Sequence, residues 1–89
     1  MSVRDTLSAL QQRRDIGVWF SCLGDHAVHR RWVVTVQHHK RMLCVGFREG
    51  ATITEVAVDG VPQASFPMGM FKTWIEILVF EFCVGHTSQ

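Results

Sequence analysis

The hydrophobic pattern is most regular in the middle of the chain, where the apolar runs "RRWVVTVQ" and "RMLCVGFR" flank the polar residues "HHK". If His39 and Lys40 form a two-residue turn, His38 lies opposite Arg41 and the apolar residues align on one face. The apolar pairs are then Trp32 with Phe47, Val34 with Val45, and Val36 with Leu43. The other face holds Val33, Thr35 and Gln37 opposite Gly46, Cys44 and Met42. A slip of one residue would scatter the apolar face, so the pattern predicts a β-hairpin with an even loop.

The first fifteen residues predict a helix with one narrow apolar stripe. Ser2 can cap the helix, and Asp5 follows three residues later in a variant of the capping box. The stripe repeats at helical spacing and consists of Val3, Leu7 and Leu10. Arg13 and Arg14 place positive charge where the helix should end.

Two further segments predict strands. Residues 16–23, "IGVWFSCL", are rich in β-formers, and we expect this strand to be buried on much of both faces. Residues 52–58, "TITEVAV", are β-branched but alternate less clearly than the hairpin, which suits an edge position. Residues 61–69 contain Pro62 and Pro67, and we expect an irregular connection there.

The C-terminal element, residues 66–85, has a mixed pattern. The length of the apolar run at 70–84 favours a helix, whereas its β-branched and aromatic content favours a strand. We expect the helix, followed by a short tail at 86–89. The predicted fold is therefore a single α+β domain spanning residues 1–89. It has an N-terminal helix, an antiparallel meander of about four strands within 16–60, and a C-terminal apolar helix packed on the sheet.

The chain is rich in apolar residues for its size. Of its 89 residues, 47% are apolar and 19% are charged, whereas globular domains average about 25% charge. A well-packed monomer would have to hide this apolar surface, and the alternative is that part of it contacts a partner or a second copy. The candidate residues for self-association are Phe71, Trp74, Leu78 and Phe82.

Charge is strongly segregated along the chain. Residues 26–48 contain five lysine and arginine residues, four histidines and no acidic residue, whereas residues 49–89 are acidic overall. In the predicted register, Arg31 lies opposite Arg48 at the hairpin base, and other basic groups crowd the tip. Such charges either bind a partner or are simply solvated. The candidate partner-binding residues are His29, Arg30, Arg31, His38, His39, Lys40, Arg41 and Arg48.

The sequence offers only weak candidates for metal or catalytic chemistry. His26 and His29, together with Cys83 and His86, have spacings that could hold a zinc ion, but a matching CxxC pair is lacking. The three cysteines lie in apolar runs, which favours buried thiols over nucleophiles and a reducing cytoplasmic location. We expect no cofactor, because the glycine-containing segments do not match a phosphate-binding loop. We therefore expect a protein that is not an enzyme.

Together these patterns predict a small non-enzymatic protein-interaction module. The N-terminal residues do not resemble a secretory signal, and no apolar run is long enough for a membrane span, so we expect no membrane partner. A phage or mobile-element regulator or inhibitor that binds a host protein or nucleoprotein complex through the basic hairpin would suit this size and charge. A direct RNA- or DNA-binding module is the alternative, although the pI of about 7.8 is low for one. A zinc-stabilised structural subunit is the third hypothesis.

Overall fold

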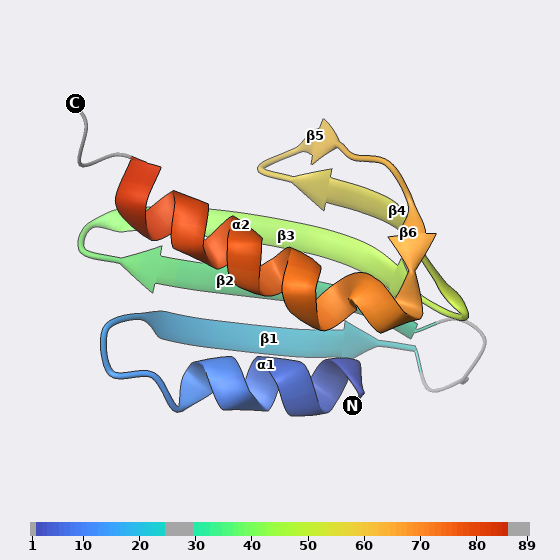
Figure 1. The fold of residues 1–89 in the computed structure, drawn as a ribbon, viewed down its shortest axis with the longest axis horizontal. Helices are drawn as coiled ribbons and strands as arrows, with labels where there is room; N and C mark the ends of the chain where they lie inside the picture. The colour runs from blue at the N-terminus through green and yellow to red at the C-terminus, as the bar shows by residue number, and fades with distance from the viewer. Residues whose placement is uncertain (1, 25–29, 86–89) are drawn as a thin grey trace.

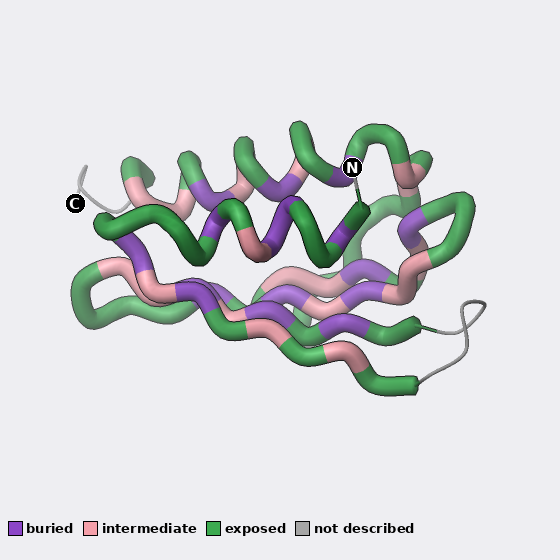
Figure 2. The backbone as a smooth tube through the Cα atoms, turned by 90° about the horizontal axis from the view of Figure 1, so that it is seen from below, coloured by how far each residue is buried: buried purple, intermediate pink, exposed green. Residues whose placement is uncertain are grey.

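A computed structural model describes residues 2–24 and 30–85 as an antiparallel sheet with two helices on one side (Figures 1 and 2). The helices are α1 (Val3–Gln11) and α2 (Phe71–Gly85), the latter preceded by a 3-10 turn, η1 (Met68–Met70). The strands are β1 (Gly17–Leu23), β2 (Arg30–His38), β3 (Arg41–Glu49), β4 (Thr52–Val58), β5 (Val61–Pro62) and β6 (Phe66–Pro67). Their order is β1-β2-β3-β4-β5, and β6 also pairs with β4. The predicted α+β fold is confirmed.

The β2–β3 hairpin has the predicted register. Trp32 pairs with Phe47, Val34 with Val45, and Val36 with Leu43, and all six side chains are buried. His38 pairs with Arg41, so His39 and Lys40 form the turn. His39 has a φ of 58° and supplies the left-handed conformation for which such turns usually use glycine or asparagine.

Helix α1 begins as predicted but ends early. The hydroxyl of Ser2 accepts a hydrogen bond from the backbone N–H of Asp5 at 3.1 Å, and the predicted stripe Val3, Leu7 and Leu10 is buried. The helix ends at Gln11 rather than at residue 15, because the chain must turn to enter β1. Arg13 lies in that turn and pairs with Asp15.

Strand β1 is buried on one face only, contrary to the sequence prediction. Val18 faces the core and is 7% exposed, whereas Trp19 and Leu23 are 54% and 58% exposed. Both helices lie on the same side of the sheet (Figure 2), so the opposite side is open. Along the outer margin of β1, where α1 runs (Figure 1), the Gln11 side-chain amide donates a hydrogen bond to the Val18 carbonyl at 3.0 Å.

A bulge in β4 explains the weak alternation of "TITEVAV". Gly46 pairs with Ala57 and Arg48 with Thr54, so β4 has one more residue than β3 between these pairs. Glu55 lies in this bulge with a φ of 51°. The chain beyond β4 is more regular than predicted, because β5 and β6 pair with the two ends of β4.

The C-terminal element is a helix, as expected. Phe71, Ile75 and Val79 recur every four residues on the face of α2 that lies on the sheet, and all three are buried. Tilted rings of Phe47 and Phe71, with centroids 5.0 Å apart, join the helix to the hairpin. The core therefore lies between one face of the sheet and the two helices.

Candidate interaction surfaces

The base of the hairpin is basic, and a carboxylate neutralises part of its charge. Arg31 and Arg48 lie directly opposite each other on the open face of the sheet. The Glu55 carboxylate accepts from Arg31 Nη2 at 2.6 Å and lies 3.0 Å from Arg48 Nη1. The β4 bulge places this carboxylate beside both arginines. Two like charges that would otherwise repel are thus joined through one acidic side chain.

The other acidic neighbour of the base is Glu49. Its Oε1 accepts a hydrogen bond from the indole Nε1 of Trp32 at 2.8 Å and lies 4.0 Å from Arg30 Nη1. The Glu49 side chain is only 13% exposed. The described arginines at the base therefore meet acidic residues that come from outside the acid-free segment, which reduces the basic surface available to a partner.

The tip of the hairpin packs against the C-terminal end of α2. The guanidinium of Arg41 lies over the Phe82 ring at 5.2 Å from its centroid. The ring of His38 contacts the rings of both His39 and Phe82, with centroid distances of 4.2 and 6.5 Å. Positive charge also suits the end of a helix, where the carbonyl groups point outward. Arg41 and His38 thus have a structural role, and Lys40 is exposed at the turn itself.

The sequence-predicted hairpin residues therefore fall into two separate groups. Arg30, Arg31 and Arg48 lie at the base, and the four residues from His38 to Arg41 lie at the tip, at opposite ends of β2 and β3. His29, the remaining member, lies outside the described residues. Whether any of them binds a partner stays a prediction.

The open face of the sheet carries a patch of exposed apolar side chains. Trp19, Leu23, Val33 and Met42 are 54%, 58%, 39% and 58% exposed, and all four lie on the face away from the helices. Between them the face is built from small or uncharged residues: Ser21, Thr35, Cys44, Gly46 and Ala57. An apolar surface bordered by charge at one end and a basic tip at the other is typical of an interaction site.

The predicted hairpin register places Val33 and Met42 on the open face, but this face is not among the sites predicted from the sequence. It missed Trp19 because β1 was expected to be buried on both faces. The alternation in "GVWFSCL" contains a usable signal, since Trp19, Ser21 and Leu23 share one face. Which face meets the helices cannot be decided from β1 alone, because both are largely apolar.

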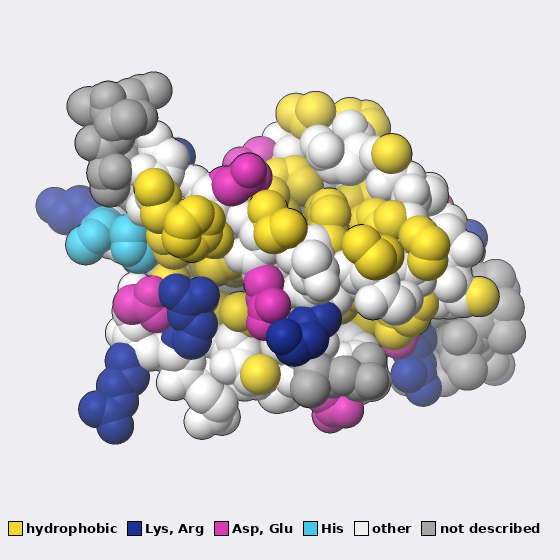
Figure 3. All heavy atoms as spheres, in the orientation of Figure 1, with side chains coloured by type: hydrophobic (Ala, Val, Ile, Leu, Met, Phe, Trp, Pro, Cys, Tyr) yellow, Lys and Arg dark blue, Asp and Glu magenta, His cyan; other side chains and the backbone are white. Residues whose placement is uncertain are grey.

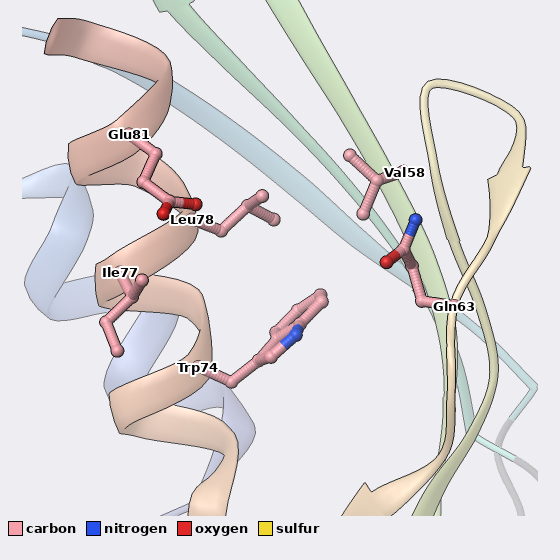
Figure 4. Close-up of a pocket in the computed structure, with 6 residues that line it drawn as sticks. All are labelled: Val58, Gln63, Trp74, Ile77, Leu78 and Glu81. Carbon is pink, nitrogen blue, oxygen red and sulfur yellow. The ribbon is translucent and has the colours of Figure 1, made fainter. Parts of the chain in front are cut away.

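A groove separates α2 from the β4–β5 hairpin. It has a volume of about 250 Å³ and is lined from α2 by Trp74, Ile77, Leu78 and Glu81, and from the sheet side by Val58 and Gln63 (Figure 4). Val58 and Gln63 come from the two sides of the β4–β5 turn at Asp59 and Gly60, both of which have positive φ. It has an apolar floor and two polar groups, which suits an apolar side chain better than a charged cofactor.

The residues proposed for self-association lie mostly on the inner side of α2. Phe71 is 2% exposed and belongs to the core. Trp74, Leu78 and Phe82 are half-buried and pack against the core. The exposed apolar residues of α2 are instead Ile77, Phe80 and Val84. The expectation that Phe71 is a surface residue is thus corrected, because its ring packs on Phe47 of the hairpin.

The weak zinc alternative gains no support from the described residues. His26, His29 and His86 lie outside them. Cys83 is half-buried, and burial raises the pKa of its thiol, which disfavours the thiolate that a metal requires. Within residues 2–24 and 30–85, no three histidine, cysteine or acidic side chains come together as a metal site would require.

Neither helix in the described part of the chain has both the length and the apolar character needed to cross a membrane. Comparison with protein-family models, curated protein sequences and solved structures finds no match to this chain.

Proposed function

We propose that this chain is a small non-enzymatic interaction module that binds another protein through the open face of its sheet and the adjoining hairpin tip. The observation that carries the proposal is the exposed patch of Trp19, Leu23, Val33 and Met42 on that face. Tryptophan and methionine are enriched at the centres of protein interfaces. A sheet face that carries a half-exposed indole can supply such a centre.

The charge around the patch indicates the chemistry of the partner. Met42 and Gln37 form the pair nearest the tip on the open face, close in sequence to the exposed Lys40. At the other end, Arg31 and Arg48 share the carboxylate of Glu55, which offsets one of their two positive charges. A matching partner would offer an apolar surface with an acidic group toward the hairpin tip. A regulator or inhibitor that occupies a host protein or nucleoprotein complex would bind in this way.

Single-stranded nucleic acid is the second candidate, and Trp19 is the observation that favours it. Bases stack on exposed aromatic rings while basic side chains contact the phosphates. Glu55 argues against this alternative, because it places a carboxylate between the two arginines that would meet the phosphate backbone. We therefore favour the protein partner.

Affinity capture from extracts of the native host, with and without nuclease, tests the proposal. Met42→Glu should abolish capture of a stoichiometric protein, and Lys40→Glu should weaken it. Val61→Glu is the matched control, because Val61 is also 58% exposed but pairs with Val58, which lines the groove on the helix side. Capture that survives Met42→Glu would exclude the sheet face. Capture that disappears with nuclease, together with oligonucleotide binding that weakens steeply with salt, would favour nucleic acid.

A further inference from the structure

Helix α2 carries apolar residues on its outer face as well as on its inner face, although it is the outer layer of the fold. Only three of its fifteen residues are charged. Two of these pair with each other, because Lys72 Nζ donates a hydrogen bond to Glu76 Oε2 at 2.9 Å. The inner face lies on the sheet, yet Ile77, Phe80 and Val84 on the outer face are 52%, 63% and 48% exposed. A helix that is apolar on all sides is normally buried on all sides. Figure 3 shows hydrophobic side chains spread across this side of the molecule.

The exposed residues of α2 follow the spacing of a coiled-coil seam. Thr73, Ile77, Phe80 and Val84 are all exposed and are separated by four, three and four residues. This spacing is that of alternating a and d positions, which pack against a second helix. A helix that only covers its own sheet needs no such seam on its outer side.

We propose that α2 pairs with α2 of a second copy, in antiparallel orientation, to form a homodimer. With the two-fold axis midway between Ile77 and Phe80, Ile77 packs against the partner's Phe80 and Thr73 against the partner's Val84. Ile77 and Phe80 then meet apolar partners, Val84 meets the smaller Thr73, and the same surface serves both copies, as a two-fold interface requires. This surface lies on the helix side, so the inference does not depend on the sheet-face proposal.

The charges beside the seam are compatible with this orientation. On one side of the seam, Glu81 lies opposite the partner's Trp74. On the other side, Glu76 lies opposite the partner's Cys83, so two like charges do not face each other at these flanking positions. A hollow of about 290 Å³ between α1 and α2 borders Phe80. Ala9 and Leu10 of α1 line its other side.

The available area suits a dimer. A large apolar side chain that is half exposed presents on the order of 100 Å² of surface. The four seam residues then supply roughly 400 Å² per copy, and the side chains that flank them need to add about 200 Å² to reach the lower limit of about 1,200 Å² in total for a specific interface. The dimer would have four layers, sheet–helix–helix–sheet, with both open sheet faces on the outside.

Sedimentation equilibrium over a range of concentrations gives the first test. The unmodified chain should dimerise, and Phe80→Glu and Ile77→Glu should each raise the dissociation constant by roughly a hundredfold, as expected for central interface residues. Met42→Glu on the open sheet face is the matched control and should leave the dimer intact. Circular dichroism should show that all three variants keep the fold. A chain that stays monomeric at every concentration would overturn the proposal.

Disulfide cross-linking tests the orientation. The background replaces Cys22, Cys44 and Cys83 by serine or alanine. Thr73→Cys and Val84→Cys chains, when mixed and oxidised, should form a mixed disulfide dimer. Neither variant alone should cross-link, because the two copies of each position lie roughly 16 Å apart along antiparallel helices. Cross-linking of Thr73→Cys with itself would indicate parallel helices, and failure of the mixture to cross-link would exclude this seam.

Discussion

The indole of Trp19 lies over Gly17, in the space that a side chain at position 17 would need. A Cβ built on Gly17 would lie 2.9 Å from Cη2 and 3.0 Å from Cζ3 of Trp19. The ring is therefore laid along β1, with the neighbouring Gln37 side chain 3.7 Å from the same point. Gly17 thus sets the orientation of the largest exposed side chain on the open sheet face.

Gly17→Ala should turn the Trp19 ring away from the strand with little change in stability, because the ring is half-exposed and can move. Nuclear Overhauser contacts between the Trp19 ring and residue 17 would report the change, and capture of the partner should weaken. Gly46→Ala is the control on the same face, since its Cβ would meet only the Trp32 carbonyl at 3.9 Å. An unmoved Trp19 ring in Gly17→Ala would disprove this account.

Glu55→Gln should lower the free energy of unfolding by about 1 kcal/mol or less, the range for partly exposed ion pairs. The substitution keeps the size of the side chain but leaves Arg31 opposite Arg48 without a shared carboxylate. Urea unfolding at low and high salt measures the effect, which should shrink as salt rises.

A double-mutant cycle provides the control for Glu55. In an Arg31→Gln background, Glu55→Gln should cost less than in the unmodified chain, because one of the two ion pairs is already gone. Equal costs in both backgrounds would show that Glu55 acts through the bulge geometry and not through its charge.

Stability should also fall in acid because of Asp15. The Arg13 side chain donates to both Asp15 carboxylate oxygens, at 3.0 and 2.5 Å, and this hydrogen bonding lowers the pKa of Asp15. The unfolded chain then binds the proton more readily, so the contribution is present above the ordinary aspartate pKa of about 3.9 and is lost as pH falls below it.

Urea unfolding from about pH 6 down to about pH 3 should reveal this loss. Asp15→Asn should be less stable than the unmodified chain at the upper end and approach it in stability at the lower end. A constant difference between the two chains across the range would mean that the ion pair does not contribute.

The hairpin could be predicted from the sequence because its register is a local property. The six apolar residues share one face only if the loop has an even number of residues. Trp32 and Phe47 are joined through a single short turn. The bulge also left a trace, since the inward residues Ile53 and Val56 are three positions apart rather than two. In contrast, the sequence does not reveal that both helices share one side, which decides that Trp19 is exposed.

The electrostatic environment of the hairpin depends on contacts between distant parts of the sequence. Arg31 and Glu55 are separated by 24 positions, and only the bulge in β4 brings them together. The number of charges along the sequence therefore overstates how basic the surface is at the base of the β2–β3 hairpin. At the tip, His39 and Lys40 are exposed, as expected for turn residues, whereas the contacts of His38 and Arg41 with Phe82 of α2 again join distant parts of the sequence.

The hydrogen bond from Gln11 to the carbonyl of Val18 also affects how large an assembly of this chain can become. Strand β1 contains no charged residue and no proline, and such an edge readily recruits further strands. Helix α1 runs along this margin, while β5 and β6 pair with the ends of β4 at the other. Polymerisation by strand addition is thus discouraged at both margins. Copies that join through α2 would stop at a pair, and the chain could accumulate in the cell without growing into fibres.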